Sequence, residues 1–557
     1  MAQVISLPLS KEEIAVLQRK HVLVIDDFAN VRKSIKGMLH TIGIKKVVEA
    51  NSANQAIVAM RENHFDVVIC DYNLGPGRDG QQLLEEVRFN NTLSFRTVYV
   101  MITAETSRDM VMGAIEFQPD DYLAKPFAFD TLKQRIVRWF LRQKTMDKLF
   151  LALDNKNHEK IIEQASLVIN KEPRFKVFAQ KKAIEAYIAL EQCETPLKMI
   201  KEINGDREQS WTKIYLAQIA LIQNKMDDAV DILKESIDKD PNLIGAYDLL
   251  SECYLKKHDD KRAQDVLQKG VQRSPRNIVR QKNLGELSLK LDDMITASKA
   301  FKEVVSLSDQ TMHDSPDNNE NLVRSLKAQL DLMEDENPEK RKLLLEVQSQ
   351  LKSFSTKYKG NDSVRLFCKV FQYKIENSTS DKDKSNVMDG FLEKALMNAD
   401  EISVDLGEEI AQLLFEDERY KDVDQLIHTL KENHKGETKI LEKLDAIQAE
   451  PVDKVQREKA QKLNVLACKQ YEEKSFEKSS DTFNQALKIS PRHPGMILNY
   501  IQSRMQSVNK EDHPIKVVNN CMEYAERLNY LEKDHYQYQR YINIVNKLKQ
   551  YQKKYHE

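Results

Sequence analysis

Glycine and proline are scarce in this chain. Its 557 residues include 15 glycines and 14 prolines, about 5% together, where an average protein has about 12%. Because these residues form most tight turns, their scarcity predicts a mainly helical protein. The length excludes a single compact domain. The 41% of hydrophobic residues is enough to bury cores along the whole chain, which excludes general disorder.

Cysteine pairs, long apolar runs and an excess of either charge are absent as well. The six cysteines are scattered without a C-x-x-C pair, so we expect neither a disulfide framework nor a zinc site. No run of 18 apolar residues occurs, so we expect a cytoplasmic protein that does not span a membrane. The 85 basic and 87 acidic residues give a net charge of −2, which excludes the overall basic field that attracts nucleic acids or anionic membranes.

An alternation of apolar runs and helical patterns occupies residues 21 to 140. Short, nearly continuous apolar runs are typical of parallel strands that helices cover on both faces. Five strands and five helices predict a flavodoxin-like, doubly wound α/β domain, in which ligands bind beyond the carboxyl ends of the strands. We expect strands at 21–26, 46–50, 65–71, 97–103 and 121–127, and helices near 29–42, 53–63, 80–89, 107–117 and 129–142.

Polar residues stand where these strands end. Asp26 and Asp27 end the first strand, Asp71 the third and Thr103 the fourth, and Lys125 follows the fifth. Three neighbouring carboxylates repel one another, and a hard cation such as Mg²⁺, which prefers oxygen ligands, relieves the repulsion. A lysine and a hydroxyl suit phosphoryl oxygens. Each residue alone could be a helix cap, a turn or loop punctuation, but their coincidence at one edge predicts a metal-dependent phosphoryl site.

These residues resemble the receiver domain of bacterial two-component response regulators. The resemblance covers residues 20–142 and is carried by VIDDF (24–28), ICDYN (69–73), MITAE (101–105) and DYLAKPF (121–127). It implies that Asp71 accepts a phosphoryl group from a sensor histidine kinase or a phosphotransfer protein. It also implies that the protein is not an enzyme, apart from its own phosphorylation and dephosphorylation at this residue.

The resemblance also implies roles for the other residues at this edge. Small Ala104 would leave room for the phosphoryl group, Tyr122 would switch together with Thr103, and the bond from Lys125 to Pro126 would be a cis peptide. Mg²⁺ would be held by Asp26, Asp27, Asp71 and the backbone carbonyl of Asn73, and the phosphoryl group by Thr103 and Lys125.

The chain departs from the family in one loop. From Asp71 to Gly80 it reads one residue longer than is usual, so we expect an extended, glycine-rich loop that alters how a kinase or phosphatase docks. Asn73 and Glu105 could orient an attacking water, and we expect a short-lived aspartyl phosphate.

After the first domain the chain has helical patterns with a 34-residue period. Small residues suit close helix crossings, and a proline ends the second helix of each pair. This pattern resembles the tetratricopeptide repeat (TPR) and implies an all-α superhelical solenoid. The columns are Leu216, Leu250 and Leu284; Ala217, Ser251 and Gly285; Ala229, Ala263 and Ala297; Leu233, Leu267 and Phe301; and Pro241 and Pro275.

We therefore expect four parts: an N-terminal extension (1–19), a receiver domain (20–142), a first TPR-like block (143–308) and a second TPR-like or helical block (309–557). The period is clearest at 210–309 and 460–491. Weaker copies lie near 143–173, 174–208 and 404–436. Polar stretches at 306–321 and 375–386 are expected to be loops, with a charged helical pair at 321–336 and 338–357 between them.

Repeat arrays form extended surfaces for other proteins, so we expect a regulator whose phosphorylation changes how the array binds a protein partner. The organisation resembles the receiver–TPR regulators of Gram-negative bacteria, such as the VieB type, and is compatible with a homodimer. Trp211 would anchor the partner, or alternatively pack between repeats. The resemblance places Trp211, Asp248, Glu252, Lys256 and Glu286 in the partner groove.

Two other hypotheses stay open. The protein could be a phosphoryl sink or modulator that docks and inhibits its own sensor kinase. It could also bind RNA through the tyrosines and lysines of residues 535–557, because aromatic rings interleaved with cations can stack bases. Those tyrosines could equally cap the last repeat, and we do not expect nucleic acid to be a partner.

Overall fold

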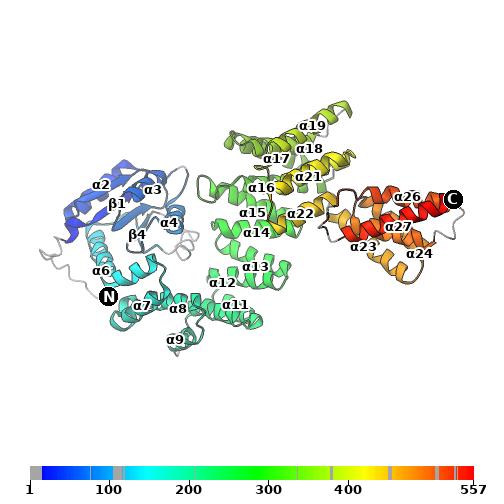
Figure 1. The fold of residues 1–557 in the computed structure, drawn as a ribbon. Coiled ribbons are helices and arrows are strands. Elements are labelled where there is room, and N and C mark those ends of the chain that lie inside the picture. The colour runs from blue at the N-terminus through cyan, green and yellow to red at the C-terminus, as the bar shows by residue number, and fades with distance from the viewer. Residues whose placement is uncertain are drawn as a thin grey trace. The chain divides into compact units, whose positions relative to one another are not determined.

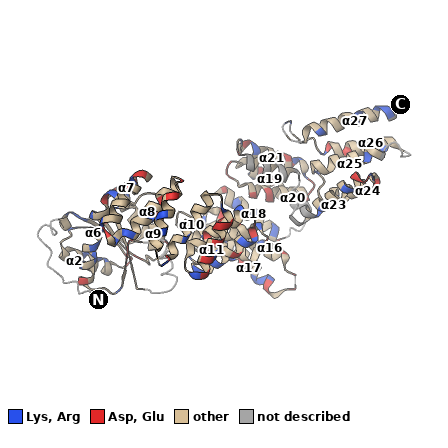
Figure 2. Cartoon of the chain, turned by 90° about the horizontal axis from the view of Figure 1, so that it is seen from below, with Lys and Arg blue, Asp and Glu red and all other residues tan. Residues whose placement is uncertain are grey.

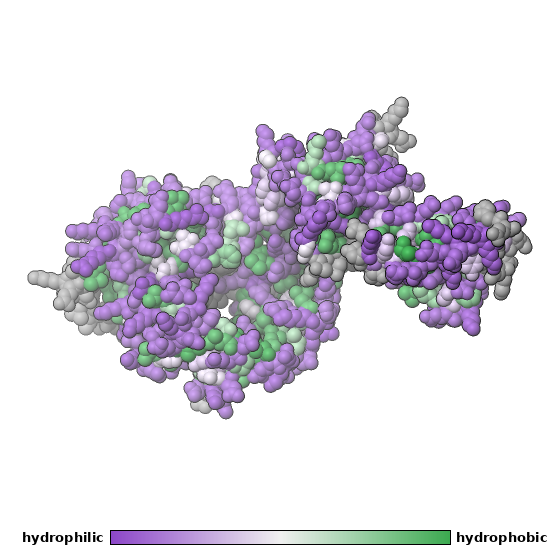
Figure 3. All heavy atoms as spheres, viewed as in Figure 1, coloured by the Kyte–Doolittle hydropathy of each residue, from purple (hydrophilic) through white to green (hydrophobic). Residues whose placement is uncertain are grey.

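The computed structural model describes all residues except 1–15, 76, 105–115, 117, 118, 206, 335, 377–380, 450–453, 508–512, 532, 534, 536 and 557. The chain forms two compact units, residues 1–347 and 348–557. Among the residues described, no helix is long and apolar enough to cross a membrane. Hydrophilic residues dominate the face drawn in Figure 3, and apolar residues form scattered patches.

The first unit begins with a five-stranded, fully parallel sheet in the order β2-β1-β3-β4-β5. This is the doubly wound α/β fold that the alternating pattern predicts (Figure 1). The strands are β1 (His21–Ile25), β2 (Lys46–Ala50), β3 (Val67–Asp71), β4 (Val98–Thr103) and β5 (Asp121–Ala124), and the described helices are α2 (Ala29–Ile42), α3 (Ala53–Glu62), α4 (Gly80–Phe89) and α6 (Phe129–Asp154).

Each face of this sheet has its own core. Alternate strand residues such as Val68 and Cys70 pack with α3 and α4, while their neighbours Val67 and Ile69 pack with α2 and α6. A strand buried on both faces needs apolar residues at every position, and all five residues of β3 are buried. The helix expected near 107–117 lies outside the described residues, apart from Glu116.

Helix α6 is longer than the sequence suggested. The helix expected near 129–142 continues to Asp154, because neither glycine nor proline interrupts residues 129–154. Its first half packs on the sheet, and its second half contributes Met146, Leu149 and Phe150 to a separate core with α7 (His158–Lys171) and α8 (Lys176–Ala189). One continuous helix thus joins the sheet domain to the helices that follow.

The helices after α6 are arranged in pairs, and three pairs repeat every 34 residues. First helices begin at residues 210, 244 and 278, and second helices at 226, 260 and 294. They are followed by the long pair expected near 321–336 and 338–357. In order, the helices are α9 (Glu194–Asn204), α10 (Ser210–Ile222), α11 (Met226–Lys239), α12 (Ile244–Lys256), α13 (Asp260–Arg273), α14 (Ile278–Lys290), α15 (Met294–Ser308), α16 (Pro316–Leu332) and α17 (Pro338–Lys357).

The turns inside these pairs explain how a glycine-poor chain makes so many reversals. Asn224, His258 and Asp292, again 34 residues apart, adopt left-handed backbone with φ of 59°, 57° and 57°. Such a conformation usually favours glycine, although asparagine, aspartate and histidine are enriched there among other residues. The helix pairs α6–α7, α8–α9, α20–α21 and α23–α24 turn in the same way, at Lys156, Glu191, Glu418 and Lys474.

The third repeat shows why small residues are needed where helices cross. A Cβ added to Gly285 would lie 2.8 Å from a ring carbon of Phe301, which is closer than packed atoms approach. Its counterparts Ala217 and Ser251 are also buried. The second and third repeats fill this crossing differently. The third has the larger Phe301 in the position of Leu267 and the smaller Gly285 in the position of Ser251, so the two changes compensate in volume.

The polar stretch 306–321 is only partly a loop. Helix α15 runs to Ser308, and α16 begins at Pro316, where the Ser315 side chain accepts a hydrogen bond from Asp317 N. Proline in the first turn and a serine cap favour a helix start, so residues 316–321 are helical and the loop is confined to 309–315. The stretch 375–386 is also largely helical, since only residues 377–380 separate α18 (Asp362–Glu376) from α19 (Asp381–Met397) and these four lie outside the described residues.

The second unit is helical throughout its described residues. Acidic and basic residues are mixed along the helices of both units (Figure 2). A core of its last helices includes Phe483, Ile497, Val518 and Leu548. After α19 the helices are α20 (Val404–Glu416), α21 (Tyr420–Asn433), α22 (Thr438–Ala449), α23 (Lys454–Glu472), α24 (Phe476–Ile489), α25 (Pro494–Ser507), α26 (Pro514–Glu526) and α27 (Tyr538–His556).

Candidate functional site

The parallel register brings three acidic residues together at the carboxyl edge of the sheet. Asp26 and Asp27 directly follow β1, Asp71 ends β3, and Ile25 pairs with Cys70 in the neighbouring strand. One carboxylate oxygen from each aspartate lies within 4.8 Å of the others. Asp26 is fully buried and Asp71 is 8% exposed, so two of these acids are held away from bulk solvent.

Lys125 joins two of the three carboxylates. Its Nζ donates hydrogen bonds to Asp26 Oδ2 at 2.8 Å and to Asp71 Oδ2 at 2.9 Å. The Lys125–Pro126 peptide is cis, and the Lys125 backbone N–H donates to the carbonyl of Thr103 at 2.7 Å. The end of β4 therefore positions the lysine that follows β5.

The charges at this edge do not balance. Burial raises the pKa of Asp71, against the hydrogen bond from Lys125 that lowers it. Burial alone would lower the pKa of Lys125, but its hydrogen bonds to Asp26 and Asp71 outweigh that effect and raise it. One ammonium group thus faces three carboxylates, and an all-oxygen donor set with excess negative charge fits Mg²⁺. Asp26, Asp27 and Asp71 are the side chains that would hold it.

The remaining residues at the edge surround this group. Thr103 is half-buried at the end of β4, and Ala104 is exposed. Asn73 is exposed, and its side-chain oxygen accepts a hydrogen bond from Gly75 N at 3.1 Å. Tyr122 on β5 is half-buried against the core of α3 and α4, and this burial raises the pKa of its phenol. Glu105 lies outside the described residues.

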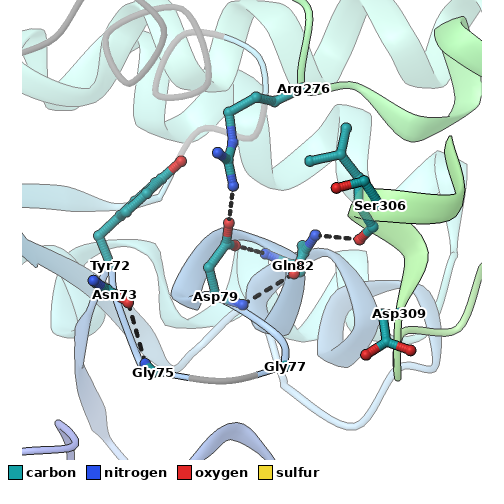
Figure 4. Close-up of a pocket in the computed structure, with 10 residues that line it drawn as sticks. Tyr72, Asn73, Gly75, Gly77, Asp79, Gln82, Arg276, Ser306 and Asp309 are labelled. Carbon is teal, nitrogen blue, oxygen red and sulfur yellow. Dashed lines mark hydrogen bonds and ion pairs between the residues drawn. The ribbon is translucent and has the colours of Figure 1, made fainter. Parts of the chain in front are cut away.

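The extended loop after Asp71 contacts the repeat array. Gly75 and Gly77 adopt left-handed backbone with φ of 79° and 95°, a conformation open to glycine. The loop leads to Asp79, whose carboxylate caps α4 by accepting from Gln82 N and also pairs with Arg276 at 2.7 Å. Figure 4 shows Arg276 above Asp79 and the Gln82 amide directed toward the end of α15.

A cavity of about 350 Å³ lies between this loop and the array, next to the acidic edge. Gln82 Nε2 donates to the carbonyl of Leu307 at 2.7 Å, and Glu85 contacts the ring of His313 at 3.1 Å. Helix α4 is therefore fixed to the junction between α15 and α16. The cavity is lined by Tyr72, Asn73, Gly75, Gly77, Asp79, Gln82, Arg276, Ser306, Leu307 and Asp309.

A second charged cluster joins the receiver to α14 of the array, and it was not predicted from the sequence. Arg280 of α14 is 2% exposed, and its guanidinium donates to both carboxylate oxygens of Asp248, each at 2.7 Å. It also pairs with Glu116, from the connection between β4 and β5, at 2.5 Å. Burial alone would lower the pKa of Arg280, but the two carboxylates raise it.

One sequence signal could have revealed Arg280. It stands in the same column as Ala246 and Thr212, 34 and 68 residues earlier, and both of those are fully buried. Charged side chains are almost never fully buried unless they are paired. An arginine in a buried column therefore indicates carboxylates nearby, although the sequence does not say which.

The four charged residues predicted to line the partner groove all form ion pairs. Asp248 is held by Arg280. Glu252 and Lys256 pair with each other along α12 at 2.8 Å, and Glu286 pairs with Lys282 along α14 at 3.8 Å. Pairs of this kind between exposed residues contribute little to stability.

Trp211 lies in the packing between repeats. Its ring meets Tyr215 edge-on at 5.8 Å, lies under the Lys181 ammonium at 5.1 Å, and packs on a core of Ile184, Ile200 and Ile219. This is the arrangement that the alternative interpretation of Trp211 anticipates, and we do not propose this residue as a partner anchor.

The aromatic C-terminal stretch also packs inward where it is described. Tyr541 is 9% exposed, and its hydroxyl donates to Asn529 at 2.8 Å. Tyr538 and Tyr551 pack on the same core, and Arg540 donates to Asn499 at 2.7 Å. Rings held in a core are not free to stack bases, which favours the capping interpretation. Tyr536 lies outside the described residues.

Comparisons with known proteins agree with the geometry of the acidic edge. The response regulator receiver domain family matches residues 22–137. The chemotaxis protein CheY of Pseudomonas aeruginosa is 34% identical over 121 residues, which are 22% of this chain and 96% of that protein. The chain belongs to the response regulator receiver family. Chemotaxis protein CheY-3 of Vibrio cholerae is 33% identical over 121 residues, 22% of this chain and 92% of that protein.

The receiver domain also matches solved structures. The Vibrio cholerae chemotaxis protein CheY4 is 28% identical and covers 21% of this chain and 97% of its own, with a TM-score of 0.20. These matches concern the receiver domain alone.

Proposed function

We propose that this protein is a response regulator whose receiver accepts a phosphoryl group on Asp71 and whose TPR-like array passes the resulting state to a protein partner. The observation that carries the proposal is the group of Asp26, Asp27 and Asp71 with Lys125 bound to two of them. The 34-residue spacing of the helix pairs supports a TPR-like array, and such arrays bind proteins.

Asp71 supplies the nucleophile. A carboxylate oxygen of Asp71 attacks the phosphorus of a phosphohistidine or of acetyl phosphate, so that a P–O bond to Asp71 forms as the bond to histidine nitrogen or to acetate oxygen breaks. Lys125, which already contacts this carboxylate, provides a positive charge for the phosphoryl oxygens, and the Thr103 hydroxyl provides a donor. Bound Mg²⁺ would neutralise negative charge during the transfer.

The proposal is tested by measuring intact mass after incubation with acetyl phosphate and Mg²⁺. We expect the addition of one phosphoryl group, and loss of that addition in Asp71→Asn or after chelation of the metal. Asp130→Asn, which changes an exposed carboxylate in the first turn of α6, is the matched control and should be modified like the wild type. An equal yield in Asp71→Asn would overturn the assignment.

A further inference from the structure

We propose that Ser274, Asn277 and Arg280 form a carboxylate cradle on the repeat array. Glu116 of the receiver occupies this cradle before phosphorylation, and an acidic segment of a partner protein occupies it afterwards. This inference rests on the proposed function, because phosphorylation at Asp71 is what exchanges the two carboxylates.

The cradle surrounds one carboxylate with three donors. Glu116 accepts from Ser274 Oγ at 2.6 Å, from Asn277 Nδ2 at 2.6 Å and from Arg280 Nη2 at 2.5 Å. Asn277 caps α14, where its oxygen accepts from Arg280 N at 2.8 Å, so its amide nitrogen is the atom left to face the carboxylate. Charge-assisted hydrogen bonds of this kind are among the strongest in proteins.

The array orients the cradle without help from the receiver. Asp248 holds the Arg280 guanidinium through two hydrogen bonds of 2.7 Å, and the carbonyl of Ser274 accepts another at 3.4 Å. If Glu116 leaves, these contacts keep the arginine in position while the donors facing Glu116 lose their acceptor. Donors that are already held in place need little further ordering when an acceptor binds, so the vacated cradle favours a new carboxylate.

The charge of the exposed junction also favours an acidic partner. Arg276 pairs with Asp79 of the receiver at 2.7 Å, and its guanidinium lies over the Tyr72 ring at 5.9 Å. When the receiver is displaced, Arg276 loses Asp79 and Arg280 loses Glu116, while Asp248 of the array stays bound to Arg280. Two guanidinium groups thus each lose a receiver carboxylate, so the surface that is exposed becomes more positive and attracts a carboxylate-rich segment.

The two receiver carboxylates that bind the arginines of α14 and its preceding turn, Asp79 and Glu116, are both connected along the chain to the phosphorylation edge. Asp79 ends the loop that starts at Asp71, and Glu116 lies between Thr103, where β4 ends, and Tyr122 on β5. A movement of Thr103 and Tyr122 on phosphorylation would therefore act on the connection that carries Glu116. Phosphorylation can shift the balance between the states with Glu116 in the cradle and out of it, provided that the phosphorylated receiver interacts more favourably in the second state.

The test uses the full chain and a fluorescein-labelled deca-glutamate peptide, with binding measured by fluorescence anisotropy. We expect Glu116→Gln to bind the peptide at least about tenfold more tightly than the wild type. Wild type with beryllofluoride and Mg²⁺, a mimic of phosphorylation, should approach that affinity, whereas Asp71→Asn with the same additions should not. A deca-glutamine peptide controls for binding without carboxylates.

A second substitution identifies the site of binding. Asn277→Asp keeps an oxygen to cap α14 but presents a negative charge to the cradle, so the fold should persist. Adding it to Glu116→Gln should remove the gain in affinity. If Glu116→Gln binds no better than the wild type, or if the double variant keeps the gain, the cradle does not take acidic partners.

The same experiment separates this inference from the proposed function. Phosphorylation of Asp71 that leaves peptide affinity unchanged overturns the exchange while the phosphoacceptor assignment stands. Dimerisation in beryllofluoride that Glu116→Gln abolishes would show that a second copy fills the cradle, which also overturns an acidic partner.

Discussion

Two cations in this protein can be compared directly, the half-buried Lys125 of the receiver and the buried Arg280 of the repeat array. Each is bound to two carboxylates: Lys125 to Asp26 and Asp71 at 2.8 and 2.9 Å, and Arg280 to residues of two different domains at 2.5 and 2.7 Å. Removing either cation would leave acidic groups without a counter-charge. The two clusters nevertheless support different functions.

The neighbours of each cation explain the difference. Lys125 faces a third carboxylate, Asp27, so negative charge is in excess and favours a divalent cation. Around Arg280 the additional groups are neutral donors, Ser274 and Asn277. The Glu116 carboxylate therefore has a full set of donors, and it joins the receiver to the array. Lysine is a compact point charge, whereas the arginine fork binds two carboxylates in fixed directions. The excess of carboxylates around Lys125 thus indicates a metal site, whereas the balanced carboxylates around Arg280 form a contact between the receiver and the array.

The largest effect is expected from Arg280→Ala, because it leaves two carboxylates without their shared cation. We expect a loss of about 3 kcal/mol in the free energy of unfolding, measured by urea denaturation followed by circular dichroism. Arg280→Lys keeps the positive charge but loses the forked guanidinium, so its free energy of unfolding should lie between those of the wild type and Arg280→Ala. A loss below about 1 kcal/mol would mean that this cluster is no more important than an exposed ion pair.

Gly285→Ala changes the same repeat without changing any charge. Its new Cβ would lie 2.8 Å from the Phe301 ring, and overpacking of this kind costs about 2 kcal/mol. Gly285→Ala with Phe301→Leu should recover most of the loss in the same urea experiment. If Gly285→Ala alone raised deca-glutamate binding as Glu116→Gln does, general loosening of the repeat would explain that binding instead of the cradle.

Lys125→Met tests the other cation. Without the ammonium, three carboxylates repel one another, so we expect Mg²⁺ to bind about tenfold more tightly than in the wild type, or about 1.4 kcal/mol. Thermal unfolding at increasing Mg²⁺ measures this, because a ligand that binds the folded state raises the melting temperature. The double variant Lys125→Met with Asp27→Asn should lose most of the gain in Mg²⁺ affinity. If the melting temperature of Lys125→Met responds to Mg²⁺ as that of the wild type does, the charges at this edge are not coupled.

Arg276→Gln should have the smallest effect. Its pair with Asp79 is partly exposed, with 42% of the Arg276 side chain accessible, so we expect a change of about 0.5 kcal/mol that shrinks as salt is added. Urea denaturation at low and high salt measures it. An effect as large as that of Arg280→Ala would place the main junction at the loop after Asp71 instead of at Glu116.

The sequence allowed the receiver to be predicted because its residues are placed by topology. Asp71 and Thr103 end parallel strands and Asp26 directly follows one, and parallel strands end at one edge. The repeat pattern was visible for a similar reason, since each helix pair packs on its neighbours with the same 34-residue spacing. Local patterns of this kind need no knowledge of distant contacts.

The junction could not be predicted in the same way. Glu116 and Arg280 are 164 residues apart, and nothing local to either residue indicates the other. The continuation of α6 to Asp154 was missed because its second half packs on a different core from its first. The turns at Asn224 and His258 were missed because the left-handed residue is not glycine.

Amide hydrogen exchange of residues 274–282 tests the central claim most directly. With beryllofluoride and Mg²⁺, we expect these amides to exchange about tenfold faster than without them, because Glu116 leaves the cradle and local opening costs less. Asp71→Asn, treated in the same way, should show no change. Unchanged exchange in wild-type protein treated with acetyl phosphate and Mg²⁺, whose intact mass shows one added phosphoryl group, would contradict the claim that phosphorylation releases the receiver from the array.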